Sequence, residues 1–212
     1  MPGTVHVVDD DASFRTAIQR RLKKGGYAVA TYPSSQNLLD RLPDDNGPGC
    51  ILLDVRIPDL NGPDLQDRLS KLGSTLPIVF LSGYADVAVT VRAIKAGAQD
   101  FLTKPVSSEH LFRVIEQAMA SHEASRGQKR KLDALRELLR SLTPRERQVF
   151  EHVVQGKINK QIALQLGATE RTIKAHRHRV MEKMKVASLA ELVSIADRLD
   201  ILTGPGVERQ IS

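Results

Sequence analysis

The stretch HVVDDD, residues 6–11, runs from apolar side chains directly into Asp9, Asp10 and Asp11. Two carboxylates about 4 Å apart repel each other by roughly 4 kcal/mol at an effective dielectric constant near 20. A cluster of acids at the end of a buried strand therefore needs a cation to compensate it. The strands and helices around this stretch indicate where that cation and its other ligands would lie.

Apolar runs alternate with amphipathic segments over the first 120 residues. The expected strands are residues 5–8, 28–32, 50–53, 78–81 and 100–103, and the expected helices are residues 12–24, 34–42, 63–72, 86–96 and 107–120. Five strand–helix units predict an α/β fold with a doubly wound parallel sheet and helices on both faces. About 120 residues suffice for one core of this kind.

Polar residues follow four of the five predicted strands. In a doubly wound sheet, ligands bind beyond the carboxyl ends of the strands. Asp54, Ser82 and Lys104 follow the third, fourth and fifth strands, so we expect them to meet Asp9 and Asp10. Mg²⁺ takes oxygen ligands, usually one or two carboxylates with waters and phosphate oxygens. A lysine is a point charge suited to phosphate, and an aspartate can accept a phosphoryl group.

Other interpretations of the acidic cluster fit less well. Calcium is disfavoured because the chain has no twelve-residue EF-hand loop. A proton-sharing carboxylate pair needs an apolar setting, and the nearby Lys104 argues against it. Asp11 is expected to cap the following helix, and His6 is expected to pack within its strand.

Four motifs together resemble the receiver domain of two-component response regulators, which has a CheY-like, flavodoxin-like (βα)5 fold. They are HVVDDD, LLDVRIPDLNG, VFLSGYAD and DFLTKP, and the resemblance covers residues 4–120. It implies that Asp54 is the phospho-acceptor. It also implies that Asp9, Asp10 and Asp54 hold Mg²⁺ together with the backbone carbonyl of Arg56.

The resemblance also assigns roles around the phosphoryl group. Lys104 would pair with it, and the Lys104–Pro105 peptide bond would be cis. Ser82 would turn toward it, and Phe101 occupies the aromatic switch position. Many members carry threonine in place of Ser82, but the hydroxyl is kept, so we expect function to be kept.

Charge and pattern change after residue 120. Residues 1–120 carry 13 basic and 14 acidic side chains, residues 121–141 carry 6 and 3, and residues 142–212 carry 12 and 8. The basic C-terminal part suggests a polyanionic partner, although a solvated basic surface is the alternative. The helix at 107–120 could continue into 121–141, although Gly127 weakens that interpretation. Four leucines at 3-4-3 spacing, Leu132, Leu135, Leu139 and Leu142, fit either a solvated helical linker or a short dimerising coil.

The last segment is predicted to be all helical. Thr143–Glu146 and Ser188–Glu191 have the pattern of capping boxes. Residues 159–166 and 169–184 read as two helices joined by Gly167-Ala168, which is helix-turn-helix spacing. Residues 142–200 resemble the LuxR-type helix-turn-helix of NarL/FixJ response regulators, and VMEKMKVASLAELV is particularly like FixJ.

This resemblance places a recognition helix at about 170–184. Its expected base contacts are Lys174, Ala175 and His178. The expected phosphate contacts are basic residues around them, Lys160, Arg171, Arg177, Arg179 and Lys183.

We therefore expect a receiver domain at 1–120, a helical linker at 121–141 and a DNA-binding domain at 142–212. One cysteine excludes an internal disulfide, and no apolar run or signal-peptide pattern points to a membrane or to export, so a cytoplasmic location is expected.

The predicted function is a transcriptional response regulator rather than a turnover enzyme. A partner histidine kinase would phosphorylate Asp54, a homodimer would form through residues 86–104, and the C-terminal domain would bind promoter DNA. RNA polymerase is a further candidate partner. Two alternatives stay open, namely a metal-dependent phosphatase or hydrolase that uses Asp54, and a regulator that binds DNA without phosphorylation.

Overall fold

The computed structural model describes residues 3–43, 47–83 and 87–202. The chain forms two compact units, Met1–Arg126 and Gly127–Ser212. The predicted helix start at residue 86 lies outside the described residues, as do residues 203–212 of the predicted DNA-binding domain. The division into 1–120, 121–141 and 142–212 stays a prediction.

The first unit is built on a parallel sheet, as predicted. Its strands are β1 (Thr4–Val8), β2 (Ala28–Tyr32), β3 (Gly49–Asp54), β4 (Ile78–Ser82) and β5 (Asp100–Thr103). They lie in the order β2-β1-β3-β4-β5, with every neighbouring pair parallel. Val8 pairs with Tyr32 on one side and with Leu53 on the other, so the residues that follow these strands emerge at one edge.

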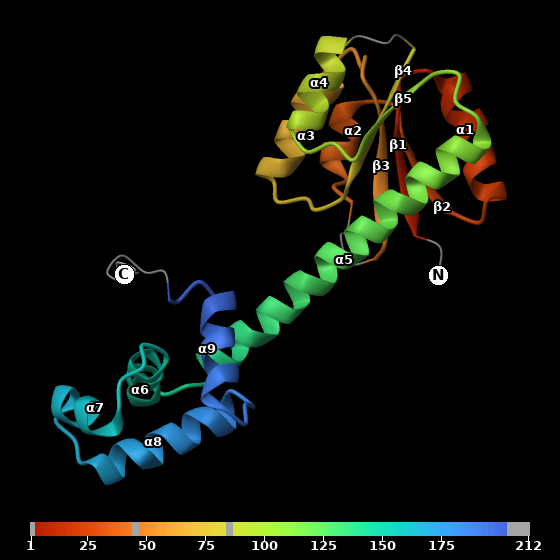
Figure 1. Cartoon of the computed structure of the whole chain (residues 1–212). Helices are drawn as coiled ribbons and strands as arrows, with labels where there is room; N and C mark the ends of the chain where they lie inside the picture. Colours follow the sequence, from red (N-terminus) through yellow and green to blue (C-terminus); the bar gives the residue numbers. More distant parts are fainter. Residues whose placement is uncertain (1–2, 44–46, 84–86, 203–212) are drawn as a thin grey trace. The chain divides into compact units, whose positions relative to one another are not determined.

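Helices cover both faces of this sheet (Figure 1). They are α1 (Ala12–Lys24), α2 (Ser35–Asp40), α3 (Gly62–Lys71), α4 (Val87–Lys95) and α5 (Ser108–Arg140). Helices α1 and α5 pack on one face, where Leu22 and Leu111 are fully buried. Helices α2, α3 and α4 pack on the other, where Leu38, Leu65 and Ala93 are fully buried. The central strands β1, β3 and β4 are buried on both sides between the two helical layers, whereas the edge strands β2 and β5 are partly exposed.

Buried polar and sulfur groups in the sheet have structural roles. His6 is packed in β1 as expected, and its Nδ1 lies 3.1 Å from the hydroxyl of Tyr32. Cys50 is fully buried in β3, and burial raises the pKa of its thiol to about 12. The thiol therefore stays protonated and unreactive at neutral pH.

Helix α5 continues through Gly127, the alternative that the glycine made less favourable but left open. A glycine in a helix interior costs about 1 kcal/mol, and the Ala, Lys, Arg, Leu and Glu residues around it are good helix formers that outweigh the cost. His122 is buried and accepts a hydrogen bond at Nδ1 from the backbone N–H of Gly49, 3.2 Å away. Helix α5 thus stays attached to the sheet beyond residue 120.

The leucine stripe of 132–142 is divided. Leu142 is buried in the core of the second unit, and Leu139 packs against that core. Leu132 and Leu135 are half-buried. Leu132 and Leu135 are thus the two leucines outside that core, and the choice between a linker and a dimerising coil stays a prediction.

The second unit is a small helical bundle. After the C-terminal part of α5 come α6 (Pro144–Val154), α7 (Asn159–Leu166), α8 (Glu170–Lys183) and α9 (Leu189–Arg198). Its core includes Val149, Phe150, Ile162, Ile173 and Leu192. Across the described residues, none of the helices combines the length and the apolar character that a membrane crossing requires.

The two predicted capping boxes form to different degrees. Thr143 and Glu146 complete theirs in both directions, and Glu146 is 2% exposed. Ser188 caps α9 by accepting from the N–H of Glu191, but the Glu191 carboxylate accepts from the N–H of Ala187 instead of Ser188. In the second box, the glutamate therefore binds the backbone N–H one residue before the N-cap instead of the N–H of the N-cap itself.

Candidate functional site

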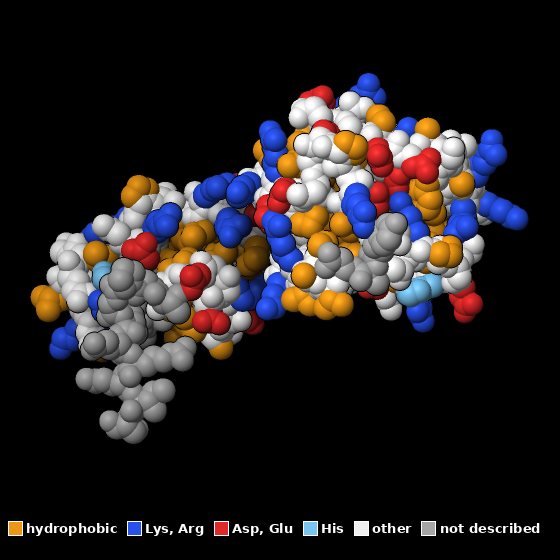
Figure 2. Space-filling model, turned by 90° about the horizontal axis from the view of Figure 1, so that it is seen from above, with side chains coloured by type: hydrophobic (Ala, Val, Ile, Leu, Met, Phe, Trp, Pro, Cys, Tyr) orange, Lys and Arg blue, Asp and Glu red, His pale blue; other side chains and the backbone are white. Residues whose placement is uncertain are grey.

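Three carboxylates meet at the carboxyl edge of the sheet. Asp9 and Asp10 follow β1, Asp54 ends β3, and their ligand oxygens lie within 4.8 Å of one another. The Lys104 ammonium, one residue past β5, lies 2.6 Å from Asp9 Oδ2 and 3.3 Å from Asp54 Oδ1. Figure 2, which looks onto this edge, shows acidic side chains gathered on the first unit. The sequence prediction for these four residues is thus met in their geometry.

The residues after β1 hold Asp9 in a fixed orientation. The N–H of Asp11 donates to Asp9 Oδ1 at 2.9 Å, and Arg15 donates to the backbone carbonyl of Asp9 at 2.6 Å. Asp11 itself caps α1 by accepting from the N–H groups of Ser13 and Phe14, as predicted. Asp11 therefore belongs to the helix and not to the carboxylate cluster.

The charge of the cluster favours a divalent cation. Burial raises the pKa of Asp54, while Lys104 lowers it and Asp9 raises it. One lysine against three carboxylates leaves an excess of two negative charges. Asp9 is buried and Asp10 is exposed, so the donor set combines fixed oxygens with an open side for waters or phosphate oxygens. This donor set fits Mg²⁺.

A cavity of about 580 Å³ adjoins the acidic cluster. Asp10, Arg56, Ser82 and Phe101 are among its lining residues. Ser82 is buried, and its carbonyl accepts from the N–H of Lys104 at 2.7 Å, which links the ends of β4 and β5. Phe101 is half-buried with its ring 6.1 Å from that of Phe80. The Lys104–Pro105 bond is cis, as expected.

Sequence reasoning missed two residues that organise the site. The Lys104 ammonium lies 3.9 Å from the centre of the Phe14 ring, a cation–π contact. Arg15 holds the backbone of Asp9. Both lie on the first turn of α1, and their positions depend on how that helix packs on the sheet. The only sequence signal for these roles was the presence of an aromatic residue and an arginine three to six positions after the acidic residues.

A helix-turn-helix forms in the second unit between α7 and α8. Gly167 ends α7 with φ +60°, the left-handed conformation that glycine adopts without strain. Arg145 of α6 donates to the carbonyl of Leu166, and Arg177 of α8 donates to Asn159 Oδ1 at 3.1 Å. The Arg177 bond joins α8 to the start of α7, and the Arg145 bond joins α6 to the end of α7.

The outer side of α8 carries most of the predicted DNA contacts. Ile173 and Val180 are buried, so α8 turns the opposite side toward solvent. The exposed predicted residues on α8 are Arg171, Lys174, Ala175, His178 and Arg179. Lys160 is exposed at the start of α7. The N-cap of α7, Ile158, supplies no side-chain oxygen, which leaves backbone N–H groups of that turn for an anion.

Two predicted phosphate contacts have partners inside the unit. The Lys183 ammonium lies 2.6 Å from Glu146 Oε2 and 3.2 Å from the carbonyl of Ser141. Arg177 is half-buried against Asn159. Lys183 joins α8 to the start of α6, and its charge is compensated by the Glu146 carboxylate.

A doubly wound sheet with this carboxylate–lysine site, followed by a helix-turn-helix unit, defines a two-component response regulator with a DNA-binding output domain. Residues 5–116 match the family model of the response regulator receiver domain. Residues 140–196 match that of the bacterial regulatory proteins of the luxR family. The chain belongs to the response regulators that join a receiver domain to a LuxR-type domain, and it is a DNA-binding transcriptional regulator.

Relatives match nearly the whole chain. Response regulator protein TodT of Pseudomonas putida is 39% identical over 92% of this chain and 86% of its own length. Transcriptional regulatory protein FixJ of Bradyrhizobium diazoefficiens is 38% identical over 94% of this chain and 97% of its own. A low-resolution structure of response regulator StyR has a TM-score of 0.81 and 39% identity, covering 93% of this chain and 100% of that one. The receiver domain implies a histidine kinase partner, and the LuxR-type domain implies DNA.

Proposed function

We propose that Asp54 accepts a phosphoryl group from a partner histidine kinase. The observation that carries this proposal is the unequal sharing of Lys104. Asp9 is buried, holds the ammonium at 2.6 Å and has its other oxygen bonded to the N–H of Asp11. Asp54 has the longer contact of 3.3 Å, so its oxygen is the more available nucleophile.

The reaction is an in-line transfer. An Asp54 carboxylate oxygen attacks phosphorus while the bond from phosphorus to the donor imidazole nitrogen breaks, and the product is an acyl phosphate. Lys104 is placed to pair with a phosphoryl oxygen. Asp9, Asp10, Asp54 and the backbone carbonyl of Arg56 would hold Mg²⁺, which would supply further neutralisation of charge on the transferring group.

The signal then reaches the outer surface of the unit. Ser82 and Phe101 line the cavity beside the acidic cluster, and Val89 of α4 lines it as well. We propose that Ser82 turns toward the phosphoryl group, that Phe101 follows, and that the face formed by 86–104 rearranges and dimerises. Val91 and Lys95 lie on this face. The phosphoryl charge shifts the population toward the associating state.

Lys174, Ala175 and His178, on the outer side of α8, contact the edges of the DNA bases. The exposed basic residues around these three contact DNA phosphates, and they are Lys160, Arg171 and Arg179. Arg177 contributes to phosphate binding while it positions α7. We leave Lys183 out of this set because of its ion pair with Glu146. A regulator bound at promoter DNA acts in the cytoplasm, with RNA polymerase as its further partner.

The test of the proposed function is phosphorylation of the full chain with Mg²⁺ and a small phosphoramidate donor. The wild-type chain gains one phosphoryl group and Asp54→Asn gains none, as read by intact-mass spectrometry. Asp11→Asn, which alters an adjacent acid outside the cluster, reacts like the wild type. Wild-type reactivity of Asp54→Asn would refute the assignment. Multiple turnovers on p-nitrophenyl phosphate would favour the hydrolase, and DNA affinity that ignores phosphorylation would favour the constitutive regulator.

A further inference from the structure

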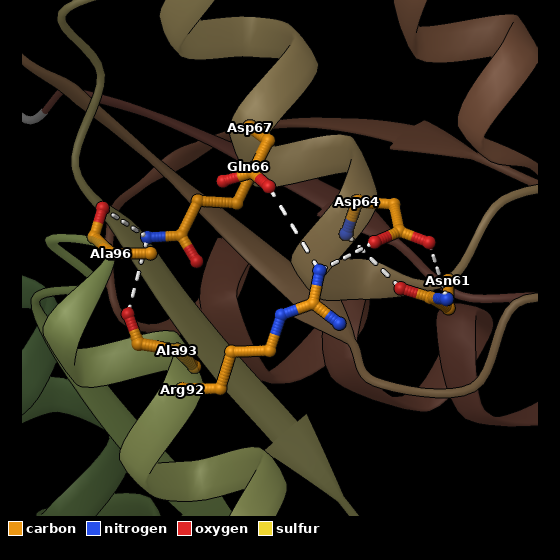
Figure 3. Close-up of polar contacts among 7 residues, drawn as sticks. All are labelled: Asn61, Asp64, Gln66, Asp67, Arg92, Ala93 and Ala96. Atoms are coloured by element: carbon orange, nitrogen blue, oxygen red, sulfur yellow. Dashed lines mark hydrogen bonds and ion pairs between the residues drawn. The ribbon is translucent and has the colours of Figure 1, made fainter.

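Helices α3 and α4 are joined by side chains that the phosphorylation chemistry does not use (Figure 3). The Arg92 guanidinium of α4 lies 2.7 Å from Asp64 Oδ1 and 3.9 Å from Asp67 Oδ2, both on α3. The Asp64 carboxylate is itself oriented, because its other oxygen accepts from Asn61 Nδ2 at 2.6 Å. The acceptor side of this ion pair is therefore preorganised on α3.

A second contact holds the C-terminal end of α4. Gln66 of α3 is 4% exposed, and its Nε2 donates to the carbonyls of Ala96 at 3.0 Å and Ala93 at 3.3 Å. The Ala93 carbonyl also accepts from the N–H of Ala98 at 3.0 Å, so Gln66 is a second donor there, and it caps the Ala96 carbonyl just past the end of the helix. Ala93 is fully buried beneath the same end.

The two contacts differ in strength. Arg92 and Asp64 are 57% and 41% exposed, and an ion pair of this kind shifts an equilibrium by up to about fivefold. Loss of a buried hydrogen bond shifts it by roughly ten- to a hundredfold. The ion pair therefore opens far more readily than the Gln66 contact, so α4 can change its position while its C-terminal end stays attached.

Arg92 also lies between the acidic site and the outer surface. It lines the cavity that holds Asp10, Ser82 and Phe101, and it lines a groove on the outer side of α4. On that side, Val87, Val91 and Ile94 are exposed at the i, i+4, i+7 spacing of one helix face. A movement of α4 that breaks the ion pair thus changes how this apolar face is presented.

We propose that Asp64, Asp67, Gln66 and Arg92 form an α3–α4 clasp that sets the threshold for phosphorylation-driven association. Gln66 is its fixed part and the Arg92 ion pair its releasable part, which favours the unphosphorylated position of α4. The proposal rests on the proposed function, because it concerns the step that follows phosphorylation of Asp54.

The test loosens the clasp from α3, away from the surface that associates. Asp64→Asn removes the charge that Arg92 meets and keeps the size of the side chain. Glu116→Gln, on α5 at the opposite layer of the sheet, is the matched control for loss of one surface carboxylate. Self-association of the full chains is measured by sedimentation velocity during titration with Mg²⁺ and beryllofluoride as the phosphoryl mimic.

Asp64→Asn should associate at a two- to fivefold lower concentration of the mimic, and Glu116→Gln should match the wild type. Asp67→Asn, which removes the longer 3.9 Å contact from the same helix and leaves Arg92 unchanged, should lower the midpoint less than Asp64→Asn does. An Asp64→Asn midpoint equal to that of the wild type would overturn the clasp.

A second measurement separates the clasp from the proposed function. Amide hydrogen exchange without the mimic should be faster in the first turns of α4 in Asp64→Asn, with exchange at Ala96 and Ala98 unchanged. If the wild type does not associate with saturating mimic, the association step of the proposed function fails, and the exchange result alone decides the clasp. Equal exchange rates along α4 in the two chains would then overturn it.

Discussion

The three consecutive aspartates have different roles although they are neighbours. Asp9 is buried and bonded on both oxygens, Asp10 is exposed beside the cavity, and Asp11 caps α1. Their roles follow from the end of β1, because each further residue turns away from the sheet. A run of like charge is therefore no guide to which members of it form a site.

The raised pKa of Asp54 predicts how Mg²⁺ binding depends on pH. Burial is the first cause of the shift, so a proton competes with the cation at a higher pH than for an ordinary carboxyl. Mg²⁺ affinity should fall as pH decreases from 7.5 toward 5, as measured by isothermal titration calorimetry. Because the pKa is raised, the metal-free unit should lose stability as pH rises through it.

Asp54→Asn is the control for this pH dependence. It should bind Mg²⁺ more weakly and lose the part of the pH profile that belongs to Asp54. An affinity for Mg²⁺ in the wild type that stays constant over this range would contradict the assignment of Asp54 as a ligand with a raised pKa.

The two capping-box motifs, at the starts of α6 and α9, differ in how much they contribute to stability because they differ in burial. The box at the start of α6 has a buried Glu146 that also bonds Lys183, whereas Glu191 at the start of α9 is exposed. The bond from Lys183 and that from the N–H of Thr143 lower the pKa of Glu146 to about 2. Burial thus turns a local cap into a tertiary contact between α6 and α8.

Glu146→Ala should lower the free energy of unfolding of the second unit by about 2–4 kcal/mol, because it removes a buried cap and leaves Lys183 without its partner. Glu191→Ala should cost about 1 kcal/mol or less. Calorimetry of the full chains compares the two, and equal losses would contradict the distinction.

The lowered pKa of Glu146 also fixes the sign of its pH dependence. Its contribution is complete above the ordinary glutamate pKa and is lost as pH falls toward 2. In Glu146→Ala, the free energy of unfolding should therefore depend less on pH in the acid range than it does in the wild type.

A glycine inside a helix and a glycine at a helix end predict opposite effects of an added methyl group on stability. Gly127 lies inside α5 with open space where a Cβ would lie, so Gly127→Ala should stabilise the chain by about 1 kcal/mol. Gly167 has equal space but φ +60°, so Gly167→Ala should destabilise by roughly 1–2 kcal/mol. Urea unfolding measures both. A destabilised Gly127→Ala would argue against a continuous α5.

Over the whole molecule, the fold and the meeting of the acidic side chains could be predicted from the sequence because each follows from short-range patterns, whereas the roles of those side chains stay predictions. Continuous apolar strands require a parallel sheet, and parallel register brings Asp9, Asp54 and Lys104 to one edge. The extent of α5 stayed open in the sequence because Gly127 counts against a helix only locally. The ion pair of Lys183 and the contacts of Arg92 depend on how helices pack, which no spacing along the chain reveals.

The charge of the C-terminal unit predicts a strong salt dependence of DNA binding. If the four assigned residues, Lys160, Arg171, Arg177 and Arg179, each neutralise one phosphate, log K should fall with log salt concentration with a slope of about −4 per subunit. Fluorescence anisotropy with promoter fragments measures it. Arg171→Gln should reduce the slope by about one unit, whereas Lys183→Gln should leave it unchanged. A slope near zero for the wild type would contradict direct phosphate contact.

The burial of Cys50 makes the chain suitable for single-site labelling. It is the only cysteine, and the chain has no tryptophan. A cysteine introduced on the surface becomes the one thiol that a maleimide dye or a nitroxide reaches in the folded protein. A tryptophan introduced beside it becomes the sole indole emitter. Distances and exchange rates between chosen points of the regulator can thus be followed spectroscopically without first replacing a native residue.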